Sequence, residues 1–216
     1  MPVKENIHHF RSLLPAHVTL VAVSKTKPAD MLMEAYEAGQ RDFGENYVQE
    51  LVEKEAALPK DIRWHFIGHL QSNKVKYIAP FVYLIHGVDS LSLLKEINKQ
   101  AQKNNRVIDC LLQLHIAEEE TKFGFDVAEI KALLASNELE NYPHVAVKGF
   151  MAMASNTSDT QKIRHEFKQV KQLQAQFPQY GILSFGMSGD YELAIEEGST
   201  MVRIGSSIFG ERDYSK

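Results

Sequence analysis

The feature that most constrains the fold is an alternation of short strand-like runs with longer helical segments. Runs rich in β-branched and aromatic residues, such as 18–24 (VTLVAVS) and 63–67 (RWHFI), are followed by segments with helical periodicity. Strands that alternate with helices pair in parallel through right-handed crossovers. The strand-like runs are 18–24, 41–43, 63–67, 82–86, 107–115, 145–151, 182–185 and 200–204, and the helical segments are 31–38, 47–58, 90–103, 127–134, 158–176 and 191–196.

Eight such units predict an α/β protein with a single closed (β/α)8 TIM-type barrel, one domain over 1–216. A TIM barrel typically takes about 250 residues, so this one is compact. Few residues follow the eighth strand, and we expect the helical segment 3–14 to cover that gap as an extra N-terminal helix. An open doubly wound sheet uses the same alternation. The count of eight favours the barrel.

Composition excludes several classes of protein. The 216 residues are 44% hydrophobic and 24% charged, which is typical of a globular domain. The net charge is −4 with scattered lysine and arginine, so neither nucleic acid nor a membrane surface is an expected partner. No apolar run approaches the roughly 20 residues that span a bilayer. With Cys110 as the single cysteine, we expect a monomeric, cytoplasmic protein without an internal disulfide.

Lys25 is the first candidate for chemistry, because it ends the apolar run VAVSK. Barrel enzymes carry their active groups at the C-terminal ends of strands. By alternation Lys25 shares a face with Val21 and Val23. If that face is the barrel interior, desolvation lowers the lysine pKa and frees the amine to attack a carbonyl. Taken alone, Lys25 is better interpreted as the start of a solvated loop, as we expect for Lys27.

The loops after the seventh and eighth strands give an independent signal. They read 186–190 (GMSGD) and 203–207 (RIGSS). Barrels often bind phosphate in these two loops, where glycine admits an anion to backbone N–H groups and serine adds donors. Strands one and eight are neighbours in a closed barrel. An aldehyde that carries a phosphate could therefore contact Lys25 and both loops together.

Other candidates are weaker. Lys148 is a rival for the reactive lysine, although its face on the sixth strand is undecided. His65 and His69 have a four-residue spacing that suits a metal only on a helix, and they straddle a strand end, so we expect no metal site. His86 and His115 are interpreted as ordinary strand-end histidines.

Five ordered sequence blocks carry a resemblance to one known family. They are VAVSKTKP (21–28), FGENYVQE (43–50), WHFIGHLQSNK (64–74), LSFGMSGD (183–190) and GSTMVRIGSSIFG (198–210). Through these blocks, and nearly end to end, the chain resembles the pyridoxal 5′-phosphate (PLP) homeostasis protein family. The resemblance implies PLP as the cofactor and a fold-type III PLP barrel like the barrel domain of bacterial alanine racemase.

The resemblance also implies which residues bind the cofactor. They are Lys25, Asn46, Ser188, Arg203, Gly205 and Ser206. Lys25 falls on the Schiff-base lysine and Arg203 on the arginine that faces the pyridine nitrogen, whereas Ser188, Gly205 and Ser206 fall on the phosphate motifs. Asn46 lies in the block that lines the side of the ring. The sequence departs from the family at Phe123 and Phe150, which affects only the expected wall of the cavity.

Two classes of function follow from this resemblance. The first, which we expect, is a carrier or regulator in intracellular PLP homeostasis that serves PLP-dependent apo-enzymes and has no catalytic residue of its own. The second is a PLP-dependent amino-acid racemase. Alanine racemase draws part of its machinery from a second, β-rich domain that this chain does not contain. An arginine against the ring nitrogen would also weaken the electron sink. A third hypothesis, a lysine-dependent aldolase that uses Lys148, needs no PLP.

Overall fold

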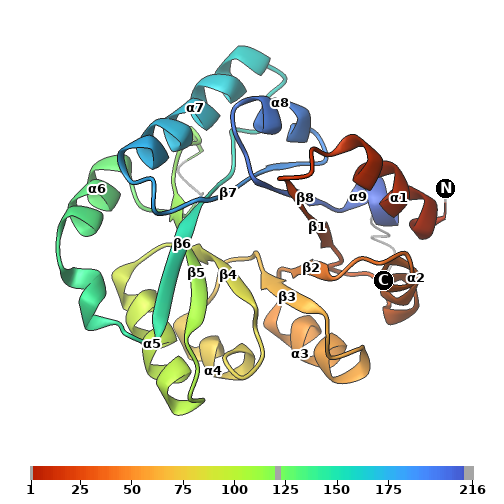
Figure 1. Ribbon diagram of the computed structural model, residues 1–216, viewed down its shortest axis with the longest axis horizontal. Coiled ribbons are helices and arrows are strands. Elements are labelled where there is room, and N and C mark those ends of the chain that lie inside the picture. Colours follow the sequence, from red (N-terminus) through yellow and green to blue (C-terminus); the bar gives the residue numbers. More distant parts are fainter. Residues whose placement is uncertain (1, 120–122, 212–216) are drawn as a thin grey trace.

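Eight parallel strands close into a barrel in sequence order, with β1 paired to β8 (Figure 1). The computed structural model describes residues 2–119 and 123–211. The strands are β1 (Thr19–Val23), β2 (Asp42–Glu45), β3 (Arg63–Phe66), β4 (Leu84–Val88), β5 (Ile108–Leu114), β6 (Val145–Ala152), β7 (Ile182–Met187) and β8 (Met201–Ile204). The predicted TIM-type barrel is therefore confirmed, and the open sheet is excluded.

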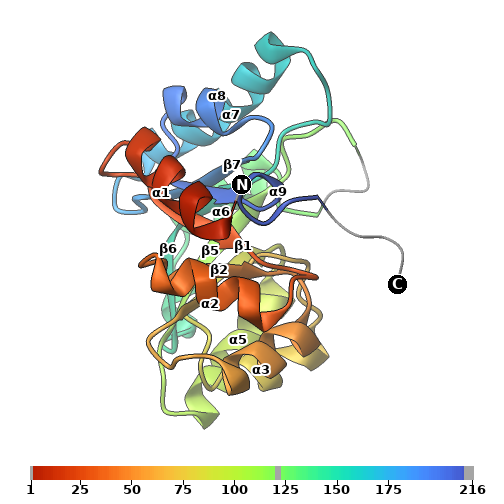
Figure 2. The same ribbon diagram turned by 90° about the vertical axis from the view of Figure 1, so that its right-hand side faces the viewer.

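A ring of helices surrounds the barrel, as Figures 1 and 2 show from two sides. The α-helices are α1 (Val3–Leu13), α2 (Ala29–Glu37), α3 (Val48–Ala57), α4 (Val75–Ile78), α5 (Leu91–Lys103), α6 (Val127–Ala135), α7 (Thr160–Gln176), α8 (Tyr191–Glu196) and α9 (Ser206–Phe209), and the 3-10 helices are η1 (Ser72–Lys74) and η2 (Glu138–Asn141). The four short helices η1, α4, η2 and α9 were not predicted, because one turn carries too little periodicity to detect. Over the described ranges, no helix has the length and apolarity needed to cross a membrane.

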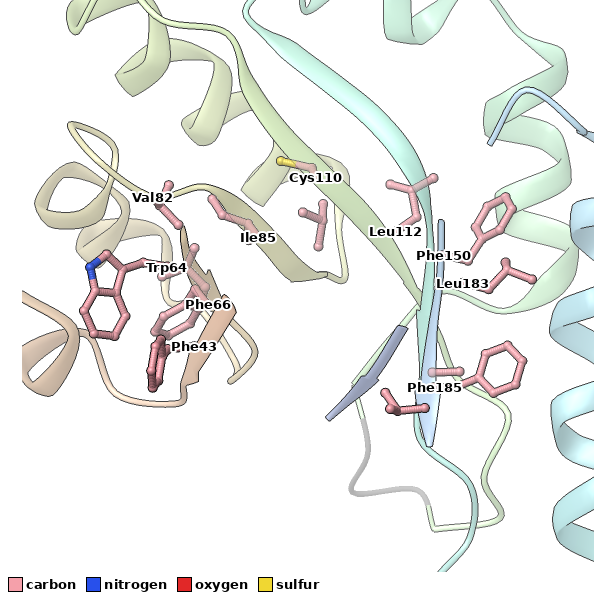
Figure 3. Close-up of a cluster of buried hydrophobic side chains, with 14 of the residues drawn as sticks. Phe43, Trp64, Phe66, Val82, Ile85, Cys110, Leu112, Phe150, Leu183 and Phe185 are labelled. Carbon is pink, nitrogen blue, oxygen red and sulfur yellow. The ribbon is translucent and has the colours of Figure 1, made fainter. Parts of the chain in front are cut away.

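Buried side chains form two separate layers. The larger lies between the strands and the helices and includes Phe66, Phe185 and Cys110 (Figure 3). Burial there raises the pKa of the Cys110 thiol well above its ordinary value, in keeping with an inert structural residue. The smaller layer, inside the barrel, consists of Val21, Leu84, Leu111, Met151 and Met201. The face of β1 that carries Val21 is therefore the barrel interior.

The N-terminal helix α1 lies between α2 and α9 (Figure 1). Asn6 Nδ2 donates to the carbonyl oxygen of Ile208, 2.8 Å away on α9. Arg11 donates to the carbonyl oxygens of Ala38 and Gly39 beyond the end of α2, at 3.2 and 2.7 Å. A cation at a helix C-terminus satisfies unpaired carbonyls. These contacts make α1 the cover of the gap beside the short α9, as predicted.

The strand boundaries differ from the prediction by one or two residues, and the differences at β4 and β2 have a structural reason. We expected β4 at 82–86, but the ladder runs from Leu84 to Val88. Val82 precedes the strand, and its apolar side chain packs in the outer core. Gly87 belongs to the strand, at a position where the backbone of Gly68 approaches closely. A Cβ at position 87 would lie 2.8 Å from the carbonyl oxygen of Gly68. We expected β2 at 41–43, whereas it ends at the buried Glu45.

A substitution at Gly149 would test how closely the backbones of β6 and β7 approach each other. A Cβ at this position would lie 1.8 Å from the carbonyl oxygen of Ile182, a backbone atom that cannot move without breaking the ladder. We expect Gly149→Ala to lower the free energy of unfolding by about 1–3 kcal/mol or more, measured by urea denaturation followed by circular dichroism. Gly181→Ala is the control, because no atom lies within 4 Å of its added Cβ; its change should stay within about 0.5 kcal/mol. Equal stabilities would contradict the close approach.

Candidate functional site

A cavity of about 280 Å³ opens at the C-terminal ends of the barrel strands. Its lining comprises Val23, Lys25, Lys27, Asn46, Ile67, Met153, Met187, Ser188, Gly189, Arg203, Gly205, Ser206 and Gly210. All six residues assigned from the sequence to cofactor binding are among them. Residues from six loops or strand ends, far apart in the chain, thus meet at one place.

Lys25 lies two residues beyond the end of β1 and is half-buried at the cavity wall. Thr26, the next residue, has a φ of 62°, a left-handed conformation that is uncommon for threonine. The amide of Thr26 donates to Glu50 Oε2 at 2.8 Å, which holds this conformation. Lys27 turns its ammonium to the carbonyl oxygen of Glu211, 2.7 Å away. The backbone directly after Lys25 is therefore held by Glu50.

A buried ionic cluster contacts the segment that carries Lys25. Lys54 on α3 donates to the carbonyl oxygen of Ser24 at 2.8 Å, to Glu45 Oε1 at 2.7 Å and to Glu50 Oε2 at 2.9 Å. Ser24 Oγ also donates to Glu45 Oε1, at 2.6 Å. Burial raises the pKa of Glu45, and Lys54 opposes that rise. Removing one member of a buried ion pair leaves the other charge buried without a partner, which is costly. Because Lys54 also binds the carbonyl oxygen of Ser24, the cluster fixes the loop that carries Lys25.

Sequence reasoning missed Lys54. The four-residue spacing of Glu50 and Lys54 on one helix was a detectable signal. The burial of Lys54 could not be detected from the sequence, because it depends on how α3 packs.

The two glycine- and serine-containing loops lie against each other and against β1. Gly186 has a φ of 97°, and a Cβ there would lie 2.5 Å from the Cβ of Ala194, so only glycine fits this turn. Gly205 N donates to Ser188 Oγ at 3.3 Å, which joins the loops. A Cβ on Gly205 would lie 3.2 Å from the carbonyl oxygen of Val23. The closed barrel thus brings the predicted phosphate loops beside the strand that carries Lys25.

Arg203 brings a buried positive charge to the cavity; its residue is only 3% exposed. Its Nη1 donates to the carbonyl oxygen and to Oγ of Ser184, both at 2.7 Å, and its Nη2 donates to the carbonyl oxygen of Ala152 at 3.1 Å. Burial lowers the pKa of Arg203 to about 10, while Asp190 acts in the opposite direction. The guanidinium therefore stays charged at neutral pH.

Asn46 forms the wall opposite the glycine loops. Its Oδ1 is buried without a hydrogen-bonding partner among the described residues. Behind it, a Cβ on Gly68 would lie 2.3 Å from the carbonyl oxygen of Asn46, so the two backbones are in direct contact. A larger hollow of about 610 Å³ on the other side of Asn46 is lined by Tyr47, His69 and Tyr77, among others, but by neither Lys25 nor Arg203.

The structure separates several other candidates from this cavity. Lys148 is exposed at a bulge of β6 and pairs with Asp109 at 3.8 Å, away from Lys25. His86 is not an ordinary strand-end histidine: it lies wholly buried in the middle of β4. Neither Phe123 nor Phe150 lines the cavity; Phe123 stacks on His69 and Phe150 packs in the outer core.

A (β/α)8 barrel with a lysine and two glycine–serine loops at its C-terminal mouth matches a known class of domain. The family model described as alanine racemase, N-terminal domain, matches residues 2–213. Among curated proteins, the pyridoxal phosphate homeostasis protein of Vibrio alginolyticus is 40% identical over 99% of both chains. That of Aquifex aeolicus (strain VF5) is 43% identical over 90% of this chain and 87% of its own. The chain belongs to the pyridoxal phosphate homeostasis protein family.

Solved structures agree with this assignment. PipY of Synechococcus elongatus PCC7942, without PLP, superposes with a TM-score of 0.90 at 38% identity and covers 96% of this chain and 100% of its own. Alanine racemase of Clostridium difficile 630 has a TM-score of 0.78 at 14% identity, over 99% of this chain and 58% of its own. The second likeness concerns the fold alone.

Proposed function

We propose that this chain binds PLP as a Schiff base on Lys25 and acts in the cytoplasm as a carrier or regulator of the cofactor. The observation that carries the proposal is that one cavity holds Lys25, the buried Arg203 and both phosphate-type loops. Further support comes from relatives named pyridoxal phosphate homeostasis protein. The PipY structure described as having PLP bound also superposes with a TM-score of 0.86 at 37% identity.

The residues present fit this cofactor. The cavity of about 280 Å³ is slightly smaller than the roughly 300–1,000 Å³ pockets of drug-sized ligands, as suits a single ring with short substituents. The partnerless Asn46 Oδ1 at its wall offers an acceptor to a polar ligand atom. Lys25 offers an amine to an aldehyde, and Ser188, Gly205 and Ser206 offer hydroxyl and backbone donors to a phosphate.

PLP supplies an aldehyde and an electron-accepting ring when it is bound. Lys25 would supply the amine with which the aldehyde could form a C=N bond, with loss of water. Apolar side chains from Val23, Ile67 and Met153 line the cavity together with Lys25. Arg203 can only donate hydrogen bonds, so it would disfavour a proton on a ring nitrogen bound against it.

A carrier role agrees with the chemistry of the cavity better than a racemase role does. Among the described lining residues, the side chains that titrate are Lys25, Lys27 and Arg203, all cationic. A racemase needs acid–base groups on both faces of its substrate, and such groups typically contribute 10²–10⁴-fold each. Lys25 could serve one face, but the described lining offers no carboxylate, histidine or tyrosine for the other. The exposed position of Lys148 removes the basis for an aldolase.

The proposal extends to the partners. We propose that PLP-dependent apo-enzymes receive the cofactor from this protein, which acts as a monomer. The surface expected to meet them is the open C-terminal mouth, because Lys25 lies there.

The Schiff base is tested by borohydride reduction. We expect the protein mixed with PLP to absorb visible light, and reduction to fix the cofactor on Lys25, located by peptide mass mapping. Lys25→Ala should abolish the adduct. Lys27→Ala should retain it, although Lys27 lines the same cavity. An adduct on Lys27 or Lys148 in the unmodified chain would overturn the assignment.

The phosphate loops are tested by comparing PLP with pyridoxal. Charge-assisted hydrogen bonds are worth about 1.5–3 kcal/mol each, so PLP should bind at least a hundredfold more tightly by fluorescence titration. The double variant Ser188→Ala, Ser206→Ala should reduce that preference at least tenfold. Ser207→Ala, next to the site but not lining it, is the control. Equal affinity for the two compounds would remove the phosphate role.

The carrier role is tested by looking for turnover. We expect pure protein loaded with PLP to show no racemisation or decarboxylation of L-amino acids at a useful rate, because the described cavity lacks a second base. Chirality and carbon dioxide release are followed for each amino acid. Turnover near about 10 per second, the median for enzymes, that disappears in Lys25→Ala would establish the racemase instead.

A further inference from the structure

A line of buried polar side chains crosses the inside of the barrel and ends at Arg203. His65 Nε2 lies 3.0 Å from Asp42 Oδ1, and His65 Nδ1 lies 2.8 Å from His86 Nε2. His86 Nδ1 lies 2.8 Å from Ser184 Oγ, which accepts from Arg203 Nη1 at 2.7 Å. The two histidines and the serine are fully buried. Five strands, β2, β3, β4, β7 and β8, each contribute one member of this line, which we term the through-barrel chain.

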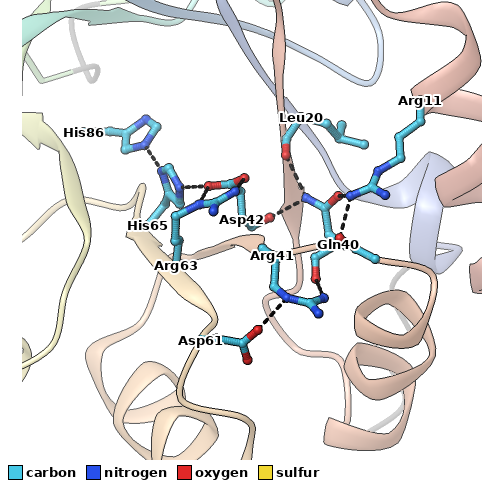
Figure 4. Close-up of polar contacts among 10 residues, drawn as sticks. Arg11, Leu20, Gln40, Arg41, Asp42, Asp61, Arg63, His65 and His86 are labelled. Atoms are coloured by element: carbon cyan, nitrogen blue, oxygen red, sulfur yellow. Dashed lines mark hydrogen bonds and ion pairs between the residues drawn. The ribbon is translucent and has the colours of Figure 1, made fainter. Parts of the chain in front are cut away.

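The other end of the through-barrel chain reaches the opposite mouth of the barrel. Asp42 begins β2, and Arg63, which begins β3, pairs with it through two hydrogen bonds of 2.7 and 2.5 Å (Figure 4). Both residues line a hollow of about 340 Å³ at the N-terminal ends of the strands. Burial alone would raise the pKa of Asp42, but hydrogen bonds from Arg63 and His65 hold it at about 2. The chain therefore ends in a fixed negative charge.

With both imidazole rings neutral, the hydrogen bonds admit one consistent direction. The ionised Asp42 can only accept, so His65 donates to it and accepts from His86. His86 accepts from Ser184 Oγ, which in turn accepts from Arg203 Nη1. His86 then carries its proton on Nε2 and donates to His65 Nδ1, and His65 carries its proton on Nε2 and donates to Asp42. Burial first, then His65 and the Arg203 cation, lower the pKa of His86 well below its ordinary value, in agreement with a neutral ring. Every donor points from the buried cation toward the buried anion.

We propose that His65, His86 and Ser184 are positioning residues, which fix the orientation of the Arg203 guanidinium at the cavity and couple it to the Asp42–Arg63 pair at the opposite mouth. Ser184 presents its hydroxyl and its carbonyl to one guanidinium nitrogen. His86 decides where that hydroxyl hydrogen points, and the Asp42 charge decides the tautomers of both histidines. That PLP is the ligand facing Arg203 rests on the proposed function.

The first test uses the protein without PLP, so that it stands apart from the proposed function. Nitrogen-15 NMR should show His65 and His86 as neutral Nε2–H tautomers at pH 7, and distinct, slowly exchanging Nη protons of Arg203. His86→Leu should abolish the slow exchange at Arg203. His86→Asn, whose side-chain oxygen can still accept from Ser184, should restore it. A charged His86, or Arg203 signals that are the same in His86→Leu and the unmodified protein, would overturn the chain.

The second test measures the bound cofactor. We expect His86→Leu to weaken PLP binding tenfold or more and to change its visible absorption spectrum, and His86→Asn to return both toward the values of the unmodified protein. Asp42→Asn should shift the spectrum in the same direction as His86→Leu, although it lies at the far mouth. Ile85→Ala is the control, because Ile85 is equally buried on β4 but packs in the outer core.

The outcomes separate the two proposals. Loss of affinity in Ile85→Ala as large as in His86→Leu would show a merely structural role for the histidines. An unchanged PLP spectrum in both Asp42→Asn and His86→Leu would disprove coupling between the mouths. If the unmodified protein bound no PLP while NMR still showed the ordered chain, the proposed function would fail and the positioning of Arg203 would stand.

Discussion

The pairing of β1 with β8 is the constraint on which the rest of the structure depends. Four register pairs join the two strands, from Thr19 with Met201 to Ala22 with Ile204. This closure gives β1 an interior face and so turns Lys25 toward the cavity. It also brings the loop that begins at Gly205 within contact of Val23. In an open sheet β1 and β8 would not meet, and the lysine would lie far from the loops expected to hold a phosphate.

Much of the fold was predictable from the sequence, because most strands are short apolar or aromatic runs and each long helix has a clear periodicity, whereas β2 (DFGE) gave a weak signal. The helix α8 (Tyr191–Glu196) lies where it was expected. The six candidate site residues were also found together, because all parallel strands of a barrel end at the same mouth. Alternation along VAVSK placed Lys25 on the same face as Val21, and the structure shows that this face lies inside the barrel.

Contacts between distant strands were not predictable. His86 reads as an ordinary member of an apolar strand, and its partners lie 21 and 98 residues away in the sequence. Parallel strands buried on both faces give nearly continuous apolar runs, so the pattern does not mark which residues face inward. Lys54 was missed for a similar reason, because surface helices usually expose their lysines. In both cases a polar residue is buried because its partners arrive from other strands or helices.

The position of α1 has a consequence for the order in which the molecule becomes functional. This helix and β1 precede every other element of the described chain, yet their partners α9 and β8 come almost at its end. During synthesis one edge of β1 remains unpaired until the seven later strands have emerged. Long-range closure of this kind is slow compared with local folding. The site for a ligand at Lys25 therefore cannot assemble on the ribosome piece by piece; it comes into existence in one late step, when β8 docks.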